Sequence, residues 1–387
     1  MFEKQMTHRF LETLNHIDYG SLSVTTPDGK LHRYTGASPD VEADITLHDW
    51  RFVPALAAHG DIGFAESYHE GWWSSSDLTK LIYFSLKNEA ALRPYIYGGL
   101  FTRLASRLAY FFTQNSLKGS RRNIQTHYDL GNDFYQLWLD ATMTYSSAIF
   151  ADEKEELSAA QHRKYDRITE RLPDAGRVLE IGCGWGGFAE RALESKDYAI
   201  KGLTLSHEQH AYARDRLKNK PAEIALEDYR IQNGKFDAIV SIEMFEAVGE
   251  KYWPVYFNKL KSLLAGGGKA VVQTITIREE YFDSYRKGGD AIRTFIFPGG
   301  MLPSHTRFTE EAARAGLRLT DHFAFGQDYA RTLERWLKGF EATLPQVKAL
   351  GFDEKFIRMW RFYLTSCIAS FRIGRTNVMQ MELEHAA

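Results

Sequence analysis

The segment that most constrains the fold is VLEIGCGWGGFAE, residues 178–190, which has the pattern of a buried strand, a glycine-rich turn and a helix. Gly182, Gly184 and Gly187 form a G-x-G-x-x-G pattern, which is typical of a turn that binds a nucleotide. The same pattern also fits a tight turn that binds no ligand. The segment therefore predicts the first strand and helix of an α/β sheet, and other residues must indicate what the turn binds.

The chain after about residue 118 alternates between strand-like and helix-like segments. Strands are predicted at 176–182, 199–205, 222–229, 236–242 and 269–276, and helices at 188–194, 206–218 and 253–264. A turn is predicted at the three glycines 266–268. This alternation predicts a doubly wound, mostly parallel sheet of the Rossmann-like type, with its ligand at the carboxyl ends of the strands.

Residues 1–115 are predicted to form a separate small mixed α/β domain, and residues 118–387 the larger domain. A hairpin is expected around residues 27–29, and an amphipathic helix after a capping Asp77. The basic and aromatic segment 101–123 has two interpretations. It either lies on an anionic membrane surface or links the domains with a solvated basic face.

The residues around the glycine turn indicate a cationic ligand. A nicotinamide dinucleotide site needs an acidic residue about 20 positions after the glycines, to hold the ribose hydroxyl groups. Here the second strand ends at Leu203, Thr204 and Leu205, and the carboxylate is Glu180, before the first glycine. S-adenosylmethionine carries an ammonium and a sulfonium group, so this arrangement predicts S-adenosylmethionine and disfavours a dehydrogenase.

Composition excludes several other classes of function. The net charge of −2 gives no support for nucleic-acid binding. No run of apolar residues approaches the roughly 20 that a membrane span needs. The two cysteines, Cys183 and Cys367, lie far apart, which favours a reduced, cytoplasmic setting. No group of histidines and carboxylates has the spacing of metal ligands, so no metal is expected.

Five segments together resemble the cyclopropane fatty acid synthase family. They are HYDLGNDFYQLWLDATMTYSSAIF, VLEIGCGWGGFAE, GLTLSHEQ, FDAIVSIEMFEAVGEKYW and FIFPGGMLPS, and the resemblance runs from about residue 127 to the C-terminus. The N-terminal part resembles the small domain of bacterial-type members, which modify acyl chains within membrane phospholipids. Members of this family transfer the methyl group of S-adenosylmethionine to a cis double bond, and most then close a cyclopropane ring.

The resemblance implies a set of cofactor contacts. It assigns Tyr128 and Ser146 to the sulfonium end, and the three glycines to the nucleoside. The ribose-side and adenine-side segments correspond to these residues: Thr204, Leu205, Gln209, Asp228 and Tyr229.

The resemblance also implies how the proton is removed after methyl transfer. In the family a bicarbonate ion acts as the base. The groups that hold this ion correspond here to Glu246, Tyr329 and a backbone group near Ile275. Two positions depart from the family pattern, because Ser147 replaces a cysteine and Gln273 replaces a histidine. Both can still donate hydrogen bonds to an anion, although neither carries a charge near neutral pH.

The sequence thus predicts an S-adenosylmethionine-dependent enzyme that forms cyclopropane fatty acids in membrane phospholipids. We expect it in the cytoplasm, in peripheral contact with the inner face of the membrane, and the resemblance leaves a homodimer open. The two departures motivate an alternative product, a methyl-branched or methylene acyl chain. A second alternative is a lipid-binding protein without catalysis, against which the intact Glu180, Glu246 and Tyr329 argue.

Overall fold

The computed structural model describes residues 2–96 and 130–386, which form two compact units. The first unit contains residues 2–96 together with segments 284–298 and 347–375, and the second unit contains the remaining described residues. The predicted domain boundary near residue 115 lies outside the described residues. Segments 284–298 and 347–375 fall within the predicted larger domain, 118–387, but their contacts place them in the first unit.

The first unit contains a four-stranded sheet. Its strands, in spatial order, are β2 (Leu31–Thr35), β1 (Tyr19–Thr25), β3 (Ser38–Leu47) and β4 (Trp73–Ser74). Strands β1 and β2 pair antiparallel, and the turn between them contains residues 27–29, so the predicted hairpin is confirmed. Strand β1 also pairs parallel with β3, which pairs antiparallel with the short β4.

The first unit also contains helices. They are α1 (Phe2–Thr13), η1 (Leu14–His16), α2 (Phe52–His59), α3 (Asp61–His69), α4 (Leu78–Lys87), α5 (Glu89–Ile96), α14 (Ala291–Phe295) and α18 (Glu354–Arg372). Helix α4 begins where the sequence predicts, because the Asp77 side chain accepts a hydrogen bond from the backbone N–H of Lys80 at 3.0 Å. Two further helices contain residues of both units: α13 (Glu279–Lys287) and α17 (Leu344–Ala349).

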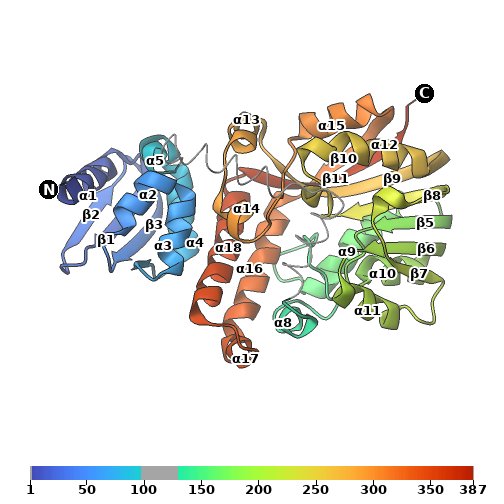
Figure 1. Cartoon of the computed structure of the whole chain (residues 1–387), viewed down its shortest axis with the longest axis horizontal. Coiled ribbons are helices and arrows are strands. Elements are labelled where there is room, and N and C mark those ends of the chain that lie inside the picture. Colours follow the sequence, from blue (N-terminus) through green and yellow to red (C-terminus); the bar gives the residue numbers. More distant parts are fainter. Residues whose placement is uncertain (1, 97–129, 387) are drawn as a thin grey trace. The chain divides into compact units, whose positions relative to one another are not determined.

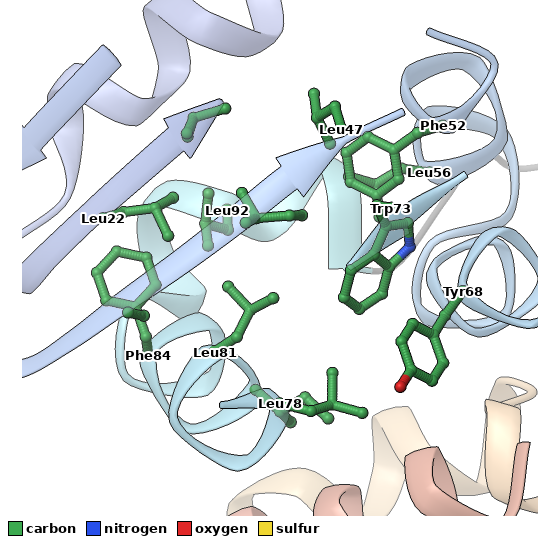
Figure 2. Packing of buried hydrophobic residues seen from close by; sticks show 14 of the residues in the cluster. Leu22, Leu47, Phe52, Leu56, Tyr68, Trp73, Leu78, Leu81, Phe84 and Leu92 are labelled. Carbon is green, nitrogen blue, oxygen red and sulfur yellow. The ribbon is translucent and has the colours of Figure 1, made fainter. Parts of the chain in front are cut away.

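The core of the first unit is built around Trp73 (Figure 2). The fully buried Trp73 stacks on Phe64, with ring centroids 4.3 Å apart, and its Nε1 donates a hydrogen bond to Ser67 Oγ at 3.0 Å. Phe362 on α18 contacts Phe64 and Tyr68, with centroid separations of 5.9 and 6.1 Å. Helix α18 belongs to this unit because it buries its apolar face in this core.

The second unit contains a seven-stranded, mostly parallel sheet. Its strands, in spatial order, are β10 (Leu317–Ala324), β11 (Thr376–His385), β9 (Leu264–Ile277), β8 (Phe236–Ile242), β5 (Ala175–Ile181), β6 (Asp197–Thr204) and β7 (Ala222–Leu226). The five strands β5 to β9 pair in parallel, whereas β11 pairs antiparallel with both β9 and the edge strand β10. The predicted Rossmann-like fold is therefore confirmed, and Figure 1 shows the strands in this order.

The second unit also contains helices, several of which connect its strands. They are α8 (Asn132–Gln136), α9 (Leu157–Thr169), α10 (Gly187–Ser195), α11 (His207–Arg216), α12 (Trp253–Leu263), α15 (His305–Arg314) and α16 (Gly326–Ala342), with short η2 (Tyr229–Ile231), η3 (Phe245–Ala247) and η4 (Glu250–Tyr252). Helices α10 and α11 lead toward β7, whereas α12 leads from β8 to β9. Right-handed crossovers in opposite directions place these helices on opposite faces of the sheet. In the described ranges, no helix is both long and apolar enough to span a bilayer.

The prediction of a turn at the glycines 266–268 is wrong. These glycines lie within β9, which begins at Leu264. The pairing of β8 with β9 shifts register between Phe236 and Ala238, and Gly267 has a φ of 78°. The glycines thus form an irregular stretch inside the strand, because their freedom at positive φ lets the backbone bend without ending the pairing.

Replacement of Trp73 by alanine is expected to destabilise the first unit by about 3–5 kcal/mol, because it removes a large buried ring from a packed core. The neighbouring Trp72 is only partly buried and serves as the matched control. We expect the Trp72→Ala variant to lose much less stability. Urea unfolding followed by circular dichroism measures both losses, and equal losses would contradict this description of the core.

Candidate active site

A pocket opens at the carboxyl ends of β5, β6 and β8. Every predicted cofactor residue that the structure describes lines it: Ser146, Glu180, Gly182, Gly184, Gly187, Thr204, Leu205, Gln209, Asp228 and Tyr229. The eleventh, Tyr128, lies outside the described residues. The pocket is therefore where the doubly wound fold leads one to expect a ligand, and the individual roles of these residues stay predictions.

The glycine turn gives this pocket a wall of backbone. The N–H groups of Gly182 and Cys183 donate hydrogen bonds to the carbonyl oxygen of Leu203, at 3.0 and 2.8 Å. Gly182 has a φ of 83°, and a Cβ atom there would lie 2.8 Å from Cγ of Met244. A side chain at position 182 is thus excluded by both conformation and space. The missing side chain leaves the backbone exposed to a ligand.

Glu180 supplies a buried negative group beside this backbone. Its side chain is 2% exposed, and its Oε2 has no hydrogen-bond partner among the described residues. Burial raises the pKa of Glu180 well above its ordinary value, and the nearby Lys164 and Arg216 oppose this rise. A buried carboxylate without a partner is costly, so a cationic group of a ligand would satisfy it. The prediction of an ammonium-bearing cofactor fits this observation.

The ends of β6 and β7 form the other wall. Thr204 Oγ1 donates a hydrogen bond to Gln209 Oε1 at 2.9 Å, which fixes both side chains at the pocket. Asp228 is held by Arg230, whose Nε and Nη2 donate to its two carboxylate oxygens at 2.8 and 2.6 Å. The ring of Tyr229 is buried, with its centroid 5.5 Å from that of Tyr256. These contacts make this wall rigid before any ligand binds.

Three of the four predicted catalytic residues meet at a residue that the sequence analysis did not assign, Glu243. Glu243 Oε1 accepts hydrogen bonds from the backbone N–H of Ser147 at 2.8 Å and from Nε2 of Gln273 at 2.7 Å. Glu243 Oε2 accepts one from Oη of Tyr329 at 2.5 Å. Glu243 itself lines the pocket. The signal that could have found it is its position directly after a predicted strand, at the sheet edge where ligands bind.

The contact of Ser147 is made by its backbone. Its hydroxyl group instead donates a hydrogen bond to the carbonyl oxygen of Ala148 at 3.1 Å. The backbone N–H is present with either serine or cysteine, so the departure at this position leaves the donor in place. Gln273, the other departure, donates with its side chain.

Glu246, the fourth predicted catalytic residue, has different partners. Its Oε1 accepts hydrogen bonds from Oγ1 of Thr274 and from the backbone N–H of Ile275. Its Oε2 has no partner in the described part of the chain. Burial, followed by the charge of Glu243, raises the pKa of Glu246 to about 8. Two neighbouring buried carboxyl groups cannot both ionise at low cost, so Glu246 holds its proton near neutral pH.

A buried lysine lies close to two carboxyl groups of the pocket, Glu243 and Glu180. Lys164 is fully buried, and its Nζ donates a hydrogen bond to Ser146 Oγ at 2.7 Å. Burial lowers the pKa of Lys164 to about 7, while Glu243 and Glu180 raise it. Sequence reasoning missed this residue because α9 has the composition of a surface helix. Lys164 positions Ser146 and provides a counter-charge to Glu243.

Further aromatic rings pack against Tyr145, an aromatic residue of the pocket lining. Tyr145 lines the pocket, and its ring centroid lies 5.2 Å from Trp336 and 5.6 Å from Trp138. Tyr329 contacts Trp336 edge-on at 6.2 Å. Aromatic faces attract cations, so this wall is suited to a substrate on which positive charge develops.

Comparison with known proteins identifies the family. The model of the mycolic acid cyclopropane synthetase family matches residues 115–381. The chain belongs to this family. It is 38% identical over 364 residues to the tuberculostearic acid methyltransferase UfaA1 of Mycobacterium tuberculosis, covering 90% of this chain and 85% of that protein. It is 34% identical over 348 residues to the cyclopropane-fatty-acyl-phospholipid synthase of Escherichia coli K12, covering 89% and 88%.

This chain is also similar in structure to the mycolic acid cyclopropane synthase CmaA1, solved in complex with SAH and CTAB. It is 32% identical, has a TM-score of 0.64, and covers 68% of this chain and 97% of that one. The predicted family is therefore confirmed, as is the prediction of an S-adenosylmethionine-dependent methyltransferase. The buried Glu180 and the open glycine turn are the features of this chain that fit the cofactor.

The Gly182→Ala variant is expected to weaken cofactor binding by about tenfold or more, ~1.4 kcal/mol, since the new methyl group strains the backbone and displaces Met244. Gly266→Ala is the matched control, because a Cβ atom at Gly266 meets nothing within 4 Å. Calorimetric titration with S-adenosylmethionine measures both. Unchanged affinity in Gly182→Ala would contradict the assignment of this turn to the cofactor.

The Glu246→Gln variant is expected to gain stability over the wild type as the pH rises. The folded pKa of Glu246, about 8, lies above the usual value of 4.5. The folded protein therefore binds an extra proton between these values, and wild-type stability falls as pH increases through this window. Glutamine does not titrate, so the variant does not lose this stability. The melting temperature of Glu246→Gln minus that of the wild type should therefore increase by on the order of a few °C from pH 5.5 to 8.5. Thermal unfolding across this range checks it, and a constant difference would contradict it.

Proposed function

We propose that the enzyme transfers a methyl group to the cis double bond of an unsaturated acyl chain in a membrane phospholipid and closes a cyclopropane ring. The observation that carries this proposal is that one pocket contains two buried carboxyl groups: Glu180, whose Oε2 has no hydrogen-bond partner in the described ranges, and the hydrogen-bonded Glu243. The first suits a cationic methyl donor. The second suits removal of a proton from a cationic product.

Each wall of the pocket then has a part in the reaction. Bound S-adenosylmethionine supplies an electrophilic methyl group. Glu180 holds its cationic amino group, and the backbone at Gly182 contacts the nucleoside. An alkene is a weak nucleophile, so catalysis depends on close alignment and on the exclusion of water. The face of Tyr145 stabilises the positive charge on the methylated acyl chain.

The proton is removed at the carboxyl cluster of Glu243 and Glu246, with Ser147, Gln273 and Tyr329 as its hydrogen-bonding partners. Loss of a proton from the transferred methyl group closes the ring. Loss from a neighbouring carbon instead leaves a methyl-branched or methylene chain. The base therefore selects the product by its position relative to the acyl cation.

A phospholipid substrate is supported by the relative from Escherichia coli, which is named for it and matches this chain over both units. A peripheral position on the cytoplasmic face of the membrane fits such a substrate. The basic segment 101–123, on which the prediction of membrane contact rests, lies outside the described residues. A homodimer likewise stays a prediction.

The methyl-branched or methylene product is a second candidate. The relative of 38% identity is named a methyltransferase and not a cyclopropane synthase, and it covers 90% of this chain. The replacement of a histidine by Gln273 at the carboxyl cluster supports the same alternative. Both products have the same mass, so only the fate of the double bond separates them.

Expression in a bacterial host that lacks its own synthase tests the proposal. We expect phospholipid acyl chains that gain one CH2 and lose the double bond. Analysis of the fatty acid methyl esters by mass spectrometry, with derivatisation of double bonds, measures both changes. A gain of CH2 with the double bond retained would favour the second candidate, and no gain in any lipid would refute both.

A further inference from the structure

Three hydrogen-bond donors from distant parts of the chain form a site for a small anion. They are the backbone N–H of Ser147, Nε2 of Gln273 on β9 and Oη of Tyr329 on α16. In the family that the sequence resembles, the corresponding positions hold a bicarbonate ion. Here all three donate to the carboxylate of Glu243, at 2.5–2.8 Å. The site for the anion is thus filled by a side chain of the same protein.

We propose that Glu243 is the catalytic base of this enzyme and takes the place of an exchangeable bicarbonate ion. The proposal deepens the proposed function and rests on it. A carboxylate and a bicarbonate ion present the same planar pair of acceptor oxygens, so the same donors serve both. With Glu243 in this position, no second anion can bind to the three donors.

The geometry favours Glu243 over Glu246 as the base. Glu243 lines the pocket, whereas Glu246 is absent from the lining and is held by Thr274 and Ile275 behind it. Glu246 retains its proton near neutral pH, which leaves the negative charge of the pair on Glu243. The three donors and the buried Lys164 stabilise that charge. Burial raises the pKa of Glu243, which makes its carboxylate a stronger base.

The backbone at Glu243 is consistent with a functional constraint. Its φ is 50°, in the left-handed region that non-glycine residues seldom occupy. Its N–H donates to the carbonyl oxygen of Gln273 at 2.7 Å, which fixes this conformation. A strained backbone conformation is retained where the surrounding contacts fix it, and such conformations are common at active sites.

The proton transfer balances without any further reactant. Methyl transfer breaks the sulfur–methyl bond, forms a carbon–carbon bond and leaves a cation on the acyl chain. Oε2 of Glu243, which accepts only from Tyr329 within the described residues, then takes a proton from the transferred methyl group. The C–H electron pair forms the last bond of the ring. Glu243 becomes neutral and returns its proton to solvent, so each turnover releases one proton.

Two variants of Glu243 test the proposal. Glu243→Gln keeps the site filled but cannot act as a base. Glu243→Gly empties the site and suits a φ of 50°. Each protein is assayed on vesicles of unsaturated phospholipid, in carbonate-free buffer and with added bicarbonate. Calorimetric binding of S-adenosylmethionine shows that each variant is folded.

We expect wild-type activity to be the same with and without bicarbonate. Glu243→Gln should lose about 10²-fold or more in both buffers, a typical contribution of a general base. Glu243→Gly should be equally inactive without bicarbonate and recover at least about tenfold with it. Near-normal turnover of Glu243→Gln, a bicarbonate requirement in the wild type, or a cofactor-binding Glu243→Gly that bicarbonate does not revive would each overturn the proposal.

A second measurement separates this inference from the proposed function. Wild-type protein that methylates no lipid in either buffer would refute the proposed function. Line broadening of ¹³C-bicarbonate in the NMR spectrum needs no turnover. We expect broadening with Glu243→Gly and none with the wild type or Glu243→Gln. Binding of bicarbonate by the wild type would show that Glu243 does not occupy the anion site, whatever the substrate.

Discussion

The parallel pairing of β5 with both β6 and β8 is the constraint on which the site depends. Glu180 on β5 lies opposite Gly202 on β6 and Val240 on β8, so the three strands end at nearly the same level. Residues at these ends, among them Thr204 and Glu243, therefore reach one pocket although they are far apart in the sequence. The other parts of the site are built onto this same edge of the sheet.

The part of the site with local sequence signals could be predicted. The strand before Gly182, the glycine spacing and the carboxylate Glu180 all lie in one short segment, and glycine at positive φ has few alternatives. The strands β5 to β8 were found because buried parallel strands are short and strongly apolar. Ser147, Gln273 and Tyr329 came from the family resemblance, and the structure brings all three together.

The position of Glu243 after a predicted strand could place it at the ligand-binding edge, but its role could not be predicted, because it arises from long-range contacts. Its hydrogen-bond partners lie 96, 30 and 86 residues away. The sequence pattern around it favoured Glu246, three residues on, and it does not indicate which of two nearby carboxyl groups faces the pocket. The same limit applies to Lys164, whose burial depends on how α9 packs in the folded unit and not on the local sequence of α9.

Each of the two units is made of several separate segments of the chain, which limits where the chain can be cut into fragments that fold. Helix α18 lies late in the sequence, yet Arg358 on it donates hydrogen bonds to the carbonyl oxygens of Tyr68 and Trp73 in the first unit. The strand β11 that follows returns to the sheet of the second unit. A fragment lacking residues 1–96 would retain α18 and expose its apolar face to water. Removal of the N-terminal region would therefore uncover Phe362 and Ala369 on α18, an apolar patch that the intact chain keeps buried.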